Sequence, residues 1–313
     1  MNITAAMVKE LREKTGVGMM DCKKALVECD GNMDEAVEFL RKKGIATAAK
    51  KASRIAAEGL VAVAISEDQK TGAVVEVNSE TDFVAKNEMF QHFVADVASQ
   101  ALTTSAADLD AFMAESWKQD PSMTVKDALI AKVAVINENL QIRRFARVES
   151  GSYVGSYVHG GGRIAVLVNV ESEIVNDAVK EAAKNVAMQV AALNPQYNSR
   201  EDVPQEFLAH ETAILTEQAE KENSQQAKPK PANVVAKMVE GRLNKELKEM
   251  CLQDQLYFRS EDGKQTVGAY LKEVSKAVGC EVKVKAYVRY ETGEGIEKKQ
   301  EDFAAEVAKQ MGQ

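Results

Sequence analysis

The pattern of apolar positions divides the chain into a helical beginning and a longer part in which strands and helices alternate. In residues 1–43, apolar side chains recur at helical spacing in three short stretches, separated by turns at Gly16 and Gly31. The residues placed to cap the first and third stretches are Thr4 and Asn32. The pattern predicts a small three-helix bundle, followed by an alanine-rich helical connector over 44–58.

Beyond Gly59 the pattern changes to β-branched runs alternating with amphipathic stretches. The predicted elements are strands 60–65 and 73–77, helices around 90–101 and 125–137, and strand 142–148. A comparable order follows, with strands 153–158 and 164–170, helices around 179–190 and 232–249, and strand 281–288. The chain therefore reads as β-β-α-α-β twice, an α+β core with antiparallel sheets.

One detail supports an internal duplication. The apolar positions of the first core helix are Phe90, Phe93, Val94, Val97 and Ala101, and those of its counterpart are Val179, Ala182, Ala183, Val186 and Val190. Both sets have the same spacing along the chain, although coincidence between two amphipathic helices remains an alternative.

The second half carries an insertion bracketed by prolines. Apolar residues recur seven apart within it, at Phe207 and Leu208 and again at Ile214 and Leu215, among charged and amide side chains. Such a narrow seam predicts a helical hairpin or coiled-coil arm over 196–231. The arm could dimerise, lie against the core or be solvated. After the last strand, an amphipathic helix is predicted over 297–311.

Composition and charge limit the candidate functions. Lys and Arg number 40 against 48 Asp and Glu, for a net charge of −8, which argues against nucleic acid as the main partner. Neither a membrane-length apolar run nor a signal-peptide core is present, so we expect a cytoplasmic protein that does not bind membranes. Four cysteines without C-x-x-C spacing and three scattered histidines predict buried, reduced thiols and no metal site.

The run His159-Gly160-Gly161-Gly162 resembles the oxyanion loop of some esterases. That chemistry also needs a G-x-S-x-G nucleophile elbow, and the chain contains none. A hairpin turn that needs positive φ explains the glycines better. Nucleotide-binding glycine motifs are missing from the sequence too, so we predict no cofactor and no covalent catalysis.

The segment 78–86, NSETDFVAK, joins a predicted strand to a helix and allows two interpretations. In the first, Thr81 or Asp82 caps the helix and Phe83 packs beneath it. In the second, Phe83 lies at the tip of a polar loop and anchors the chain in a pocket of another protein. Met19 and Met20 pose the same choice between core and contact surface.

Four strings in register resemble one family. They are LREKTGVGMMDCKKAL at 11–26, TDFVAK at 81–86, KMVEGR at 237–242 and GEGIEK at 293–298. Together they resemble the bacterial elongation factor Ts family over essentially the whole chain. The resemblance implies a guanine-nucleotide exchange factor that binds the GDP form of the GTPase elongation factor Tu, with no cofactor and no covalent chemistry of its own.

The resemblance also implies an organisation and a set of contact residues. We expect a ubiquitin-associated-like (UBA-like) helical domain over 1–54 and a first core half over 55–149. The second core half covers 150–195 and 232–290 and is interrupted by a dimerisation arm over 196–231. A C-terminal helical module covers 291–313. The Asp-Phe pair of the family's TDFV motif, which enters the nucleotide-binding domain of the GTPase near its magnesium, corresponds here to Asp82 and Phe83. Thr81 and Val84 of the same motif are expected as further contact residues. The positions expected to touch the same domain are Arg12, Met19, Met20 and Lys23, and His159 is expected to meet another domain.

The chain departs from the family pattern at Asn137, where glycine is frequent, and in the turn sequence HGGGR at 159–163. An alternative function is a UBA-like adaptor that binds partners without accelerating exchange. A hydrolase that uses His159 is a third, much weaker hypothesis, because the serine elbow is missing.

Overall fold

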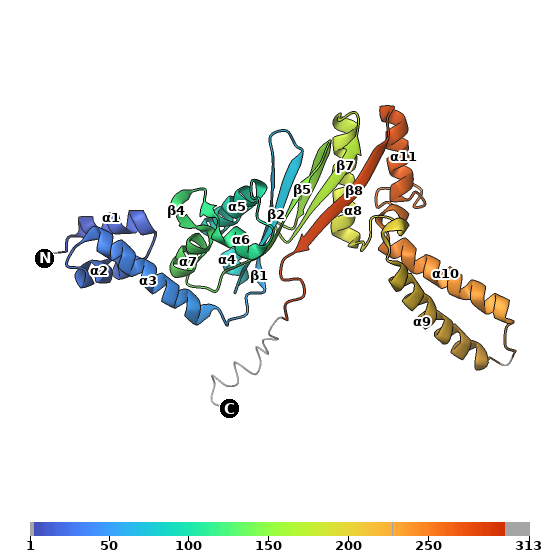
Figure 1. Cartoon of the computed structure of the whole chain (residues 1–313), viewed down its shortest axis with the longest axis horizontal. Helices are drawn as coiled ribbons and strands as arrows, with labels where there is room; N and C mark the ends of the chain where they lie inside the picture. Colours follow the sequence, from blue (N-terminus) through green and yellow to red (C-terminus); the bar gives the residue numbers. More distant parts are fainter. Residues whose placement is uncertain (1–2, 227, 298–313) are drawn as a thin grey trace.

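The computed structural model describes residues 3–226 and 228–297. Figure 1 shows an elongated molecule, with a helical bundle at one end, a core of two sheets flanked by helices, and a helical hairpin at the other end. Helices and antiparallel sheets occur together, which confirms the predicted α+β fold.

The N-terminal bundle consists of α1 (Ala5–Thr15), α2 (Met19–Glu28) and α3 (Met33–Lys51). Thr4 and Asn32 cap α1 and α3 as predicted, each accepting hydrogen bonds from backbone N–H groups of the first turn. The predicted helical connector is present only in part: residues 44–51 are helical as the continuation of α3, and the helix ends at Lys51 rather than near residue 58. Gly44 lets α3 lie close to α7 (Val125–Ile136), because an added Cβ would sit 3.3 Å from Ala134 Cβ.

The first core half is a three-stranded antiparallel sheet covered by helices. Its strands are β1 (Glu58–Ile65), β2 (Thr71–Ser79) and β5 (Gln141–Glu149), in the order β1-β2-β5. The predicted helices are α5 (Glu88–Leu102) and α7 (Val125–Ile136). The elements that periodicity did not predict are the short α4 (Asp82–Ala85), α6 (Leu109–Ala114), β3 (Ser116–Trp117) and β4 (Asp120–Thr124).

The second half repeats this plan. Its strands are β6 (Tyr153–His159), β7 (Ile164–Ser172) and β8 (Val282–Glu291), in the order β6-β7-β8, with α8 (Asp177–Leu193) as the counterpart of α5. Each middle strand has an irregularity in its pairing with the third strand, between Glu76 and Val77 in β2 and between Asn169 and Val170 in β7. This shared defect supports the internal duplication independently of the helix spacing.

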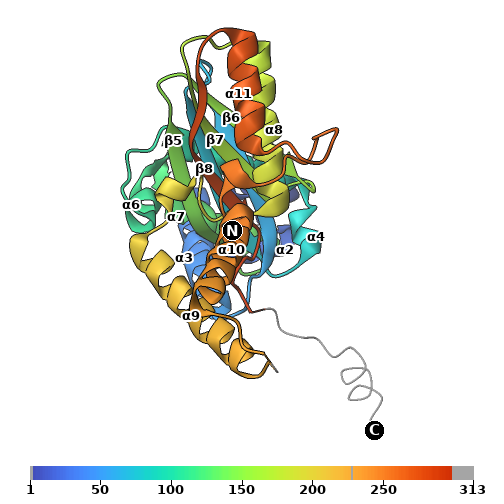
Figure 2. The ribbon, with the colours of Figure 1, turned by 90° about the vertical axis from the view of Figure 1, so that its right-hand side faces the viewer.

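The arm contains one helix that sequence analysis assigned to the core. Helix α9 (Gln205–Ser224) packs along α10 (Ala232–Met250), and Leu215, Ala219, Val235 and Val239 are buried between them. The helix predicted over 232–249 is therefore present, but its placement against the second sheet is wrong. The helix that covers this sheet beside α8 is α11 (Val267–Val278), as Figure 2 shows.

The two sheets pack face to face between their helices. Successive residues of β2 point to opposite sides: Ala73, Val75 and Val77 pack on the helices of the first half, while Val74 packs with Val61 against Leu167 of the other sheet. Because β2 is buried on both faces, its apolar residues Ala73–Val75 are consecutive rather than alternating, and the polar side chains of Glu76 and Asn78 that follow are buried as well. The core halves thus form one helix–sheet–sheet–helix stack.

Four further predictions concern the C-terminal helix, the cysteines, a membrane span and a metal site. The helix over 297–311 lies outside the described residues, except for Glu297. All four cysteines are free thiols; Cys22 and Cys251 are buried as predicted, whereas Cys29 and Cys280 are only partly buried. Within residues 3–226 and 228–297, no helix has the length and apolarity needed to cross a membrane, and no three His, Cys, Asp or Glu side chains are grouped to hold a metal ion.

Candidate partner-binding site

The loop between β2 and α5 exposes an aromatic ring. Its residues form the short helix α4, whose N-cap is Thr81; the Thr81 hydroxyl accepts a hydrogen bond from Val84 N–H. Val84 packs against the first core, whereas the side chain of Phe83 is 80% exposed. Packing of Phe83 beneath the helix is therefore wrong, and the ring lies at the surface, although most phenylalanines are buried.

Asp82 is engaged with its own helix. Its carboxylate lies 2.6 Å from Lys86 Nζ, and this charged hydrogen bond lowers the pKa of Asp82. Lys86 Nζ also lies 5.9 Å from the centre of the Phe83 ring. Both side chains are exposed, so the pair stabilises the turn only weakly. The arrangement leaves one face of the aromatic ring beside a cation and the rest open to solvent.

Glu138 fixes this loop from a distant part of the chain. One oxygen of its carboxylate accepts the N–H groups of Glu80 and Thr81, both at 3.1 Å, and the other accepts the Thr81 hydroxyl at 2.7 Å. Glu80 reciprocates, since its carboxylate accepts Asn139 N–H at 2.6 Å and lies 3.4 Å from Arg54. Each of the segments 80–81 and 138–139 thus contributes a carboxylate that accepts backbone N–H groups of the other segment.

Asn137 allows Glu138 to reach the loop. It ends α7 in the left-handed conformation, with φ 64° and ψ 29°, and its N–H bonds to Val133 O. Asparagine is one of the few residues other than glycine that adopts this conformation readily. The departure from the family pattern at Asn137 therefore keeps the sharp turn. Sequence analysis did not identify Glu80 and Glu138 as positioning residues, because no local pattern links side chains 58 residues apart.

The predicted contact residues of the N-terminal bundle are all exposed. Met19 and Met20 begin α2, with exposed fractions of 48% and 69%, and Arg12 and Lys23 are exposed beside them in sequence on α1 and α2. The choice left open for the methionines is therefore decided in favour of surface. Val27 is also exposed, and its spacing of seven from Met20 is a signal that could have added it to the set.

His159 ends β6 at the glycine turn. The three glycines that follow it all have positive φ, as expected for a turn, and the imidazole is exposed. Its Nδ1 lies 2.9 Å from the Tyr157 hydroxyl, and this phenol is the one side chain hydrogen-bonded to His159 in the described part of the chain. No serine hydroxyl contacts His159 there, so the geometry gives no support to a hydrolase.

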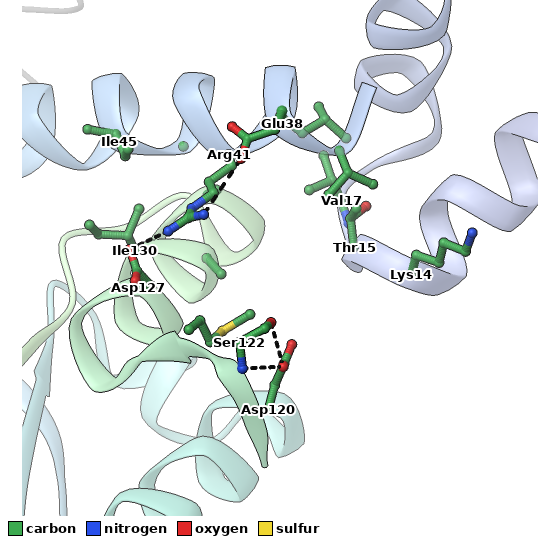
Figure 3. A pocket seen from close by; sticks show the side chains of 16 residues that line it. Lys14, Thr15, Val17, Glu38, Arg41, Ile45, Asp120, Ser122, Asp127 and Ile130 are labelled. Carbon is green, nitrogen blue, oxygen red and sulfur yellow. Dashed lines mark hydrogen bonds and ion pairs between the residues drawn. The ribbon is translucent and has the colours of Figure 1, made fainter. Parts of the chain in front are cut away.

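A cleft separates the bundle from the core, as Figure 3 shows. Its volume is about 290 Å³, and Arg41 crosses it from α3 to reach Asp127 at the start of α7, at 3.3 Å. None of the predicted contact residues lines this cleft. The structure therefore places the predicted site residues on three separate surfaces: α4, the α1–α2 face of the bundle, and the end of β6.

Comparison with known proteins gives one consistent result. The family model described as Elongation factor TS matches residues 80–294. That span begins at Glu80, next to α4, and ends in the turn after β8. The chain belongs to the elongation factor Ts family.

Full-length relatives agree with this assignment. Elongation factor Ts of Clostridioides difficile (strain 630) is 54% identical over 310 residues, which cover 99% of each chain. Elongation factor Ts of Clostridium tetani is 53% identical, again over 99% of both chains. Membership of the elongation factor Ts family implies nucleotide exchange on elongation factor Tu in translation, rather than catalysis of a covalent reaction.

Proposed function

We propose that this protein binds the GDP form of elongation factor Tu, perturbs the magnesium and phosphate site of that GTPase, and so promotes GDP release and rebinding of GTP. The observation that carries the proposal is the Phe83 ring, which is 80% exposed on a loop held rigidly by Glu138. An exposed aromatic on a fixed support is suited to insert into a pocket of a partner.

The mechanism follows from how a GTPase of this type holds its nucleotide. Backbone N–H groups and a magnesium ion bind the phosphates of GDP. Magnesium demands near-octahedral coordination, so a small displacement of its ligands weakens the site sharply. Phe83 acts as a wedge that causes this displacement, and Thr81, Asp82 and Val84 present it. Factor and nucleotide then weaken each other's binding, as linkage requires.

The other predicted residues add contact area. Arg12, Met19, Met20 and Lys23 bind the nucleotide-binding domain of the GTPase from the bundle, and His159 contacts a second domain. The exposed methionines favour this role, because their flexible thioether side chains adapt to irregular partner surfaces. Dimerisation through the arm and a cytoplasmic location stay predictions; the apolar seam of α9 already packs on α10 within one chain.

The proposal is tested by measuring release of fluorescent GDP from elongation factor Tu with and without this protein. We expect catalytic amounts of the protein to accelerate release. The same exposed bundle residues also fit an adaptor without exchange activity, which would bind the GTPase and leave the release rate unchanged. That outcome would reject the exchange proposal.

A second test concerns the support of the loop. Glu138→Ala removes the acceptor of three hydrogen bonds, and we expect a loss of about 2 kcal/mol in the free energy of unfolding, since N–H groups of the loop lose their partners. The GDP-release rate should also fall, by about tenfold. Urea unfolding and nucleotide release measure the two effects.

Two control variants make the test of Glu138 specific. Glu67→Ala, in the exposed turn between β1 and β2, should change neither quantity. Glu138→Gln keeps one acceptor oxygen and should fall between Glu138→Ala and the unmodified protein. If Glu138→Ala stimulated GDP release as fast as the unmodified protein, the loop would not need the hydrogen bonds of Glu138 for exchange.

A further inference from the structure

Besides the surfaces assigned above, the second core half carries a polar groove of about 620 Å³ between β6, α8 and the loop after α10. The groove forms where β6 and α8 come unusually close together. Gly155 of β6 faces Ala183 of α8, and an added Cβ at Gly155 would lie 2.7 Å from Ala183 Cβ. The missing side chain lets the helix approach the strand, and the larger Tyr153 and Tyr157, two residues away on either side, form one wall of the groove.

Three cations line this groove. Lys180 and Lys184 lie one turn apart on α8, and Arg259 comes from the loop before α11. Within the described ranges, none of the three side chains makes an ion pair with a carboxylate of this chain. Like charges at this helical spacing repel each other, which costs a few tenths of a kcal/mol. Among the described residues, Glu181 is the one carboxylate that lines the groove, so the three cations and this carboxylate together carry a charge of +2.

Arg259 is held in place by a buried amide. Gln189 of α8 is fully buried; its side chain accepts Phe258 N–H at 3.0 Å and donates to Leu256 O at 3.0 Å. These two bonds fix the loop on α8 immediately before Arg259. The third cation is therefore presented by a rigid support rather than by a freely moving loop.

The groove is continuous with the surface that presents His159. Tyr157 lines the groove, and its hydroxyl is 2.9 Å from His159 Nδ1. A partner bound at His159 would therefore lie next to the three cations of the groove. Nucleic acid is a poor alternative, because the tyrosine rings pack on the core rather than offering faces for stacking, and the chain carries a net charge of −8.

We propose that this groove binds an acidic segment of the GTPase, next to the domain contact made by His159. The inference rests on the proposed function and extends it to a stated chemistry of the partner surface. The segment supplies carboxylates to Lys180, Lys184 and Arg259. Charges at the edge of an interface act mainly by accelerating encounter and fixing orientation, and they are screened by salt.

The test is charge reversal by Lys180→Glu with Lys184→Glu. We expect the association rate constant with GDP-bound elongation factor Tu to fall about tenfold at about 50 mM salt, and the difference to shrink to about twofold at about 300 mM. Arg259→Glu, on a separate loop, should change association in the same direction.

The matched control is Lys272→Glu with Lys276→Glu, an exposed pair of the same spacing on α11 that does not line the groove. It changes the net charge equally and should leave association within about twofold. An equal loss of association rate in the two double variants would overturn the proposal. It would also be overturned if the unmodified protein bound a single-stranded RNA and only the Lys180→Glu, Lys184→Glu variant lost that binding. Failure of the proposed function is distinguishable, because the unmodified protein would then bind without releasing GDP.

Discussion

Phe83→Ala should slow the release of GDP that this protein stimulates by about 30-fold or more, while leaving its own fold intact. A large aromatic anchor in a partner pocket commonly contributes about 2 kcal/mol or more, and each 1.4 kcal/mol corresponds to about tenfold. The ring is 80% exposed, so its removal deletes little internal packing. We expect the free energy of unfolding to change by no more than about 0.5 kcal/mol. Fluorescent GDP release and urea unfolding measure the two quantities.

Phe258→Ala is the matched control for this experiment. Phe258 is also an exposed phenylalanine on a loop, 46% accessible, but it lies in the second core half. Its removal should leave stimulated GDP release within about twofold. An unchanged release rate in Phe83→Ala would remove the wedge from the mechanism, even if the protein still bound the GTPase.

Glu76→Ala should cause the largest loss of stability of any single substitution considered for this protein. The carboxylate is fully buried in β2 and accepts hydrogen bonds from Gly293 N–H at 2.8 Å and from the side chains of Asn78, Arg143 and Arg144. Removing one partner of a buried ionic network leaves the other charges uncompensated, and this costs about 3–5 kcal/mol. Urea unfolding measures the loss, and Glu149→Ala, which breaks an exposed pair with Arg147, should cost about 0.5 kcal/mol or less.

The same carboxylate predicts a pH dependence. Burial alone would raise the pKa of Glu76, but its hydrogen bonds to Gly293, Arg143, Asn78 and Arg144 hold that pKa below the usual range. The stabilisation is therefore complete above the unfolded-state pKa of about 4.3 and is lost as the pH falls through the lower folded-state value. The difference in unfolding free energy between Glu76→Ala and the unmodified protein should shrink in that acid range. A difference that stayed constant there would contradict the ionised network.

The Glu76 network has a consequence for the C-terminal segment. Gly293 follows the last strand of the second half, yet its N–H bonds to a carboxylate of the first half. Its φ of 72° suits glycine, and an added Cβ would lie 2.2 Å from Ala57 O. The string GEGIEK thus begins in a turn locked between the two halves. Glu76 thus fixes the turn that follows β8.

Helix α10 shows where periodicity reaches its limit. Its amphipathic pattern over 232–249 identified a helix correctly, but the helix that covers the second sheet beside α8 is the more strongly amphipathic α11, which the sequence analysis did not predict. The sequence predicts that a segment is amphipathic without naming the surface that it covers. The pairing of α9 with α10 depends on contacts between their apolar side chains, and the periodicity within either helix does not predict these contacts.

The amino-acid sequence by itself determined the six long strands, the helices α1–α3, α5 and α7–α10, the duplicated plan and the family. It did so because burial repeats with the period of each helix or strand and because four motifs stand in register. Tertiary structure decided what happens to Phe83. Its exposure depends on Val84 packing inward and on the Glu138 carboxylate binding the backbone of the loop from 57 and 58 residues away. Hydrogen bonds over such separations leave no periodic trace in a sequence, since either partner alone reads as an ordinary polar residue.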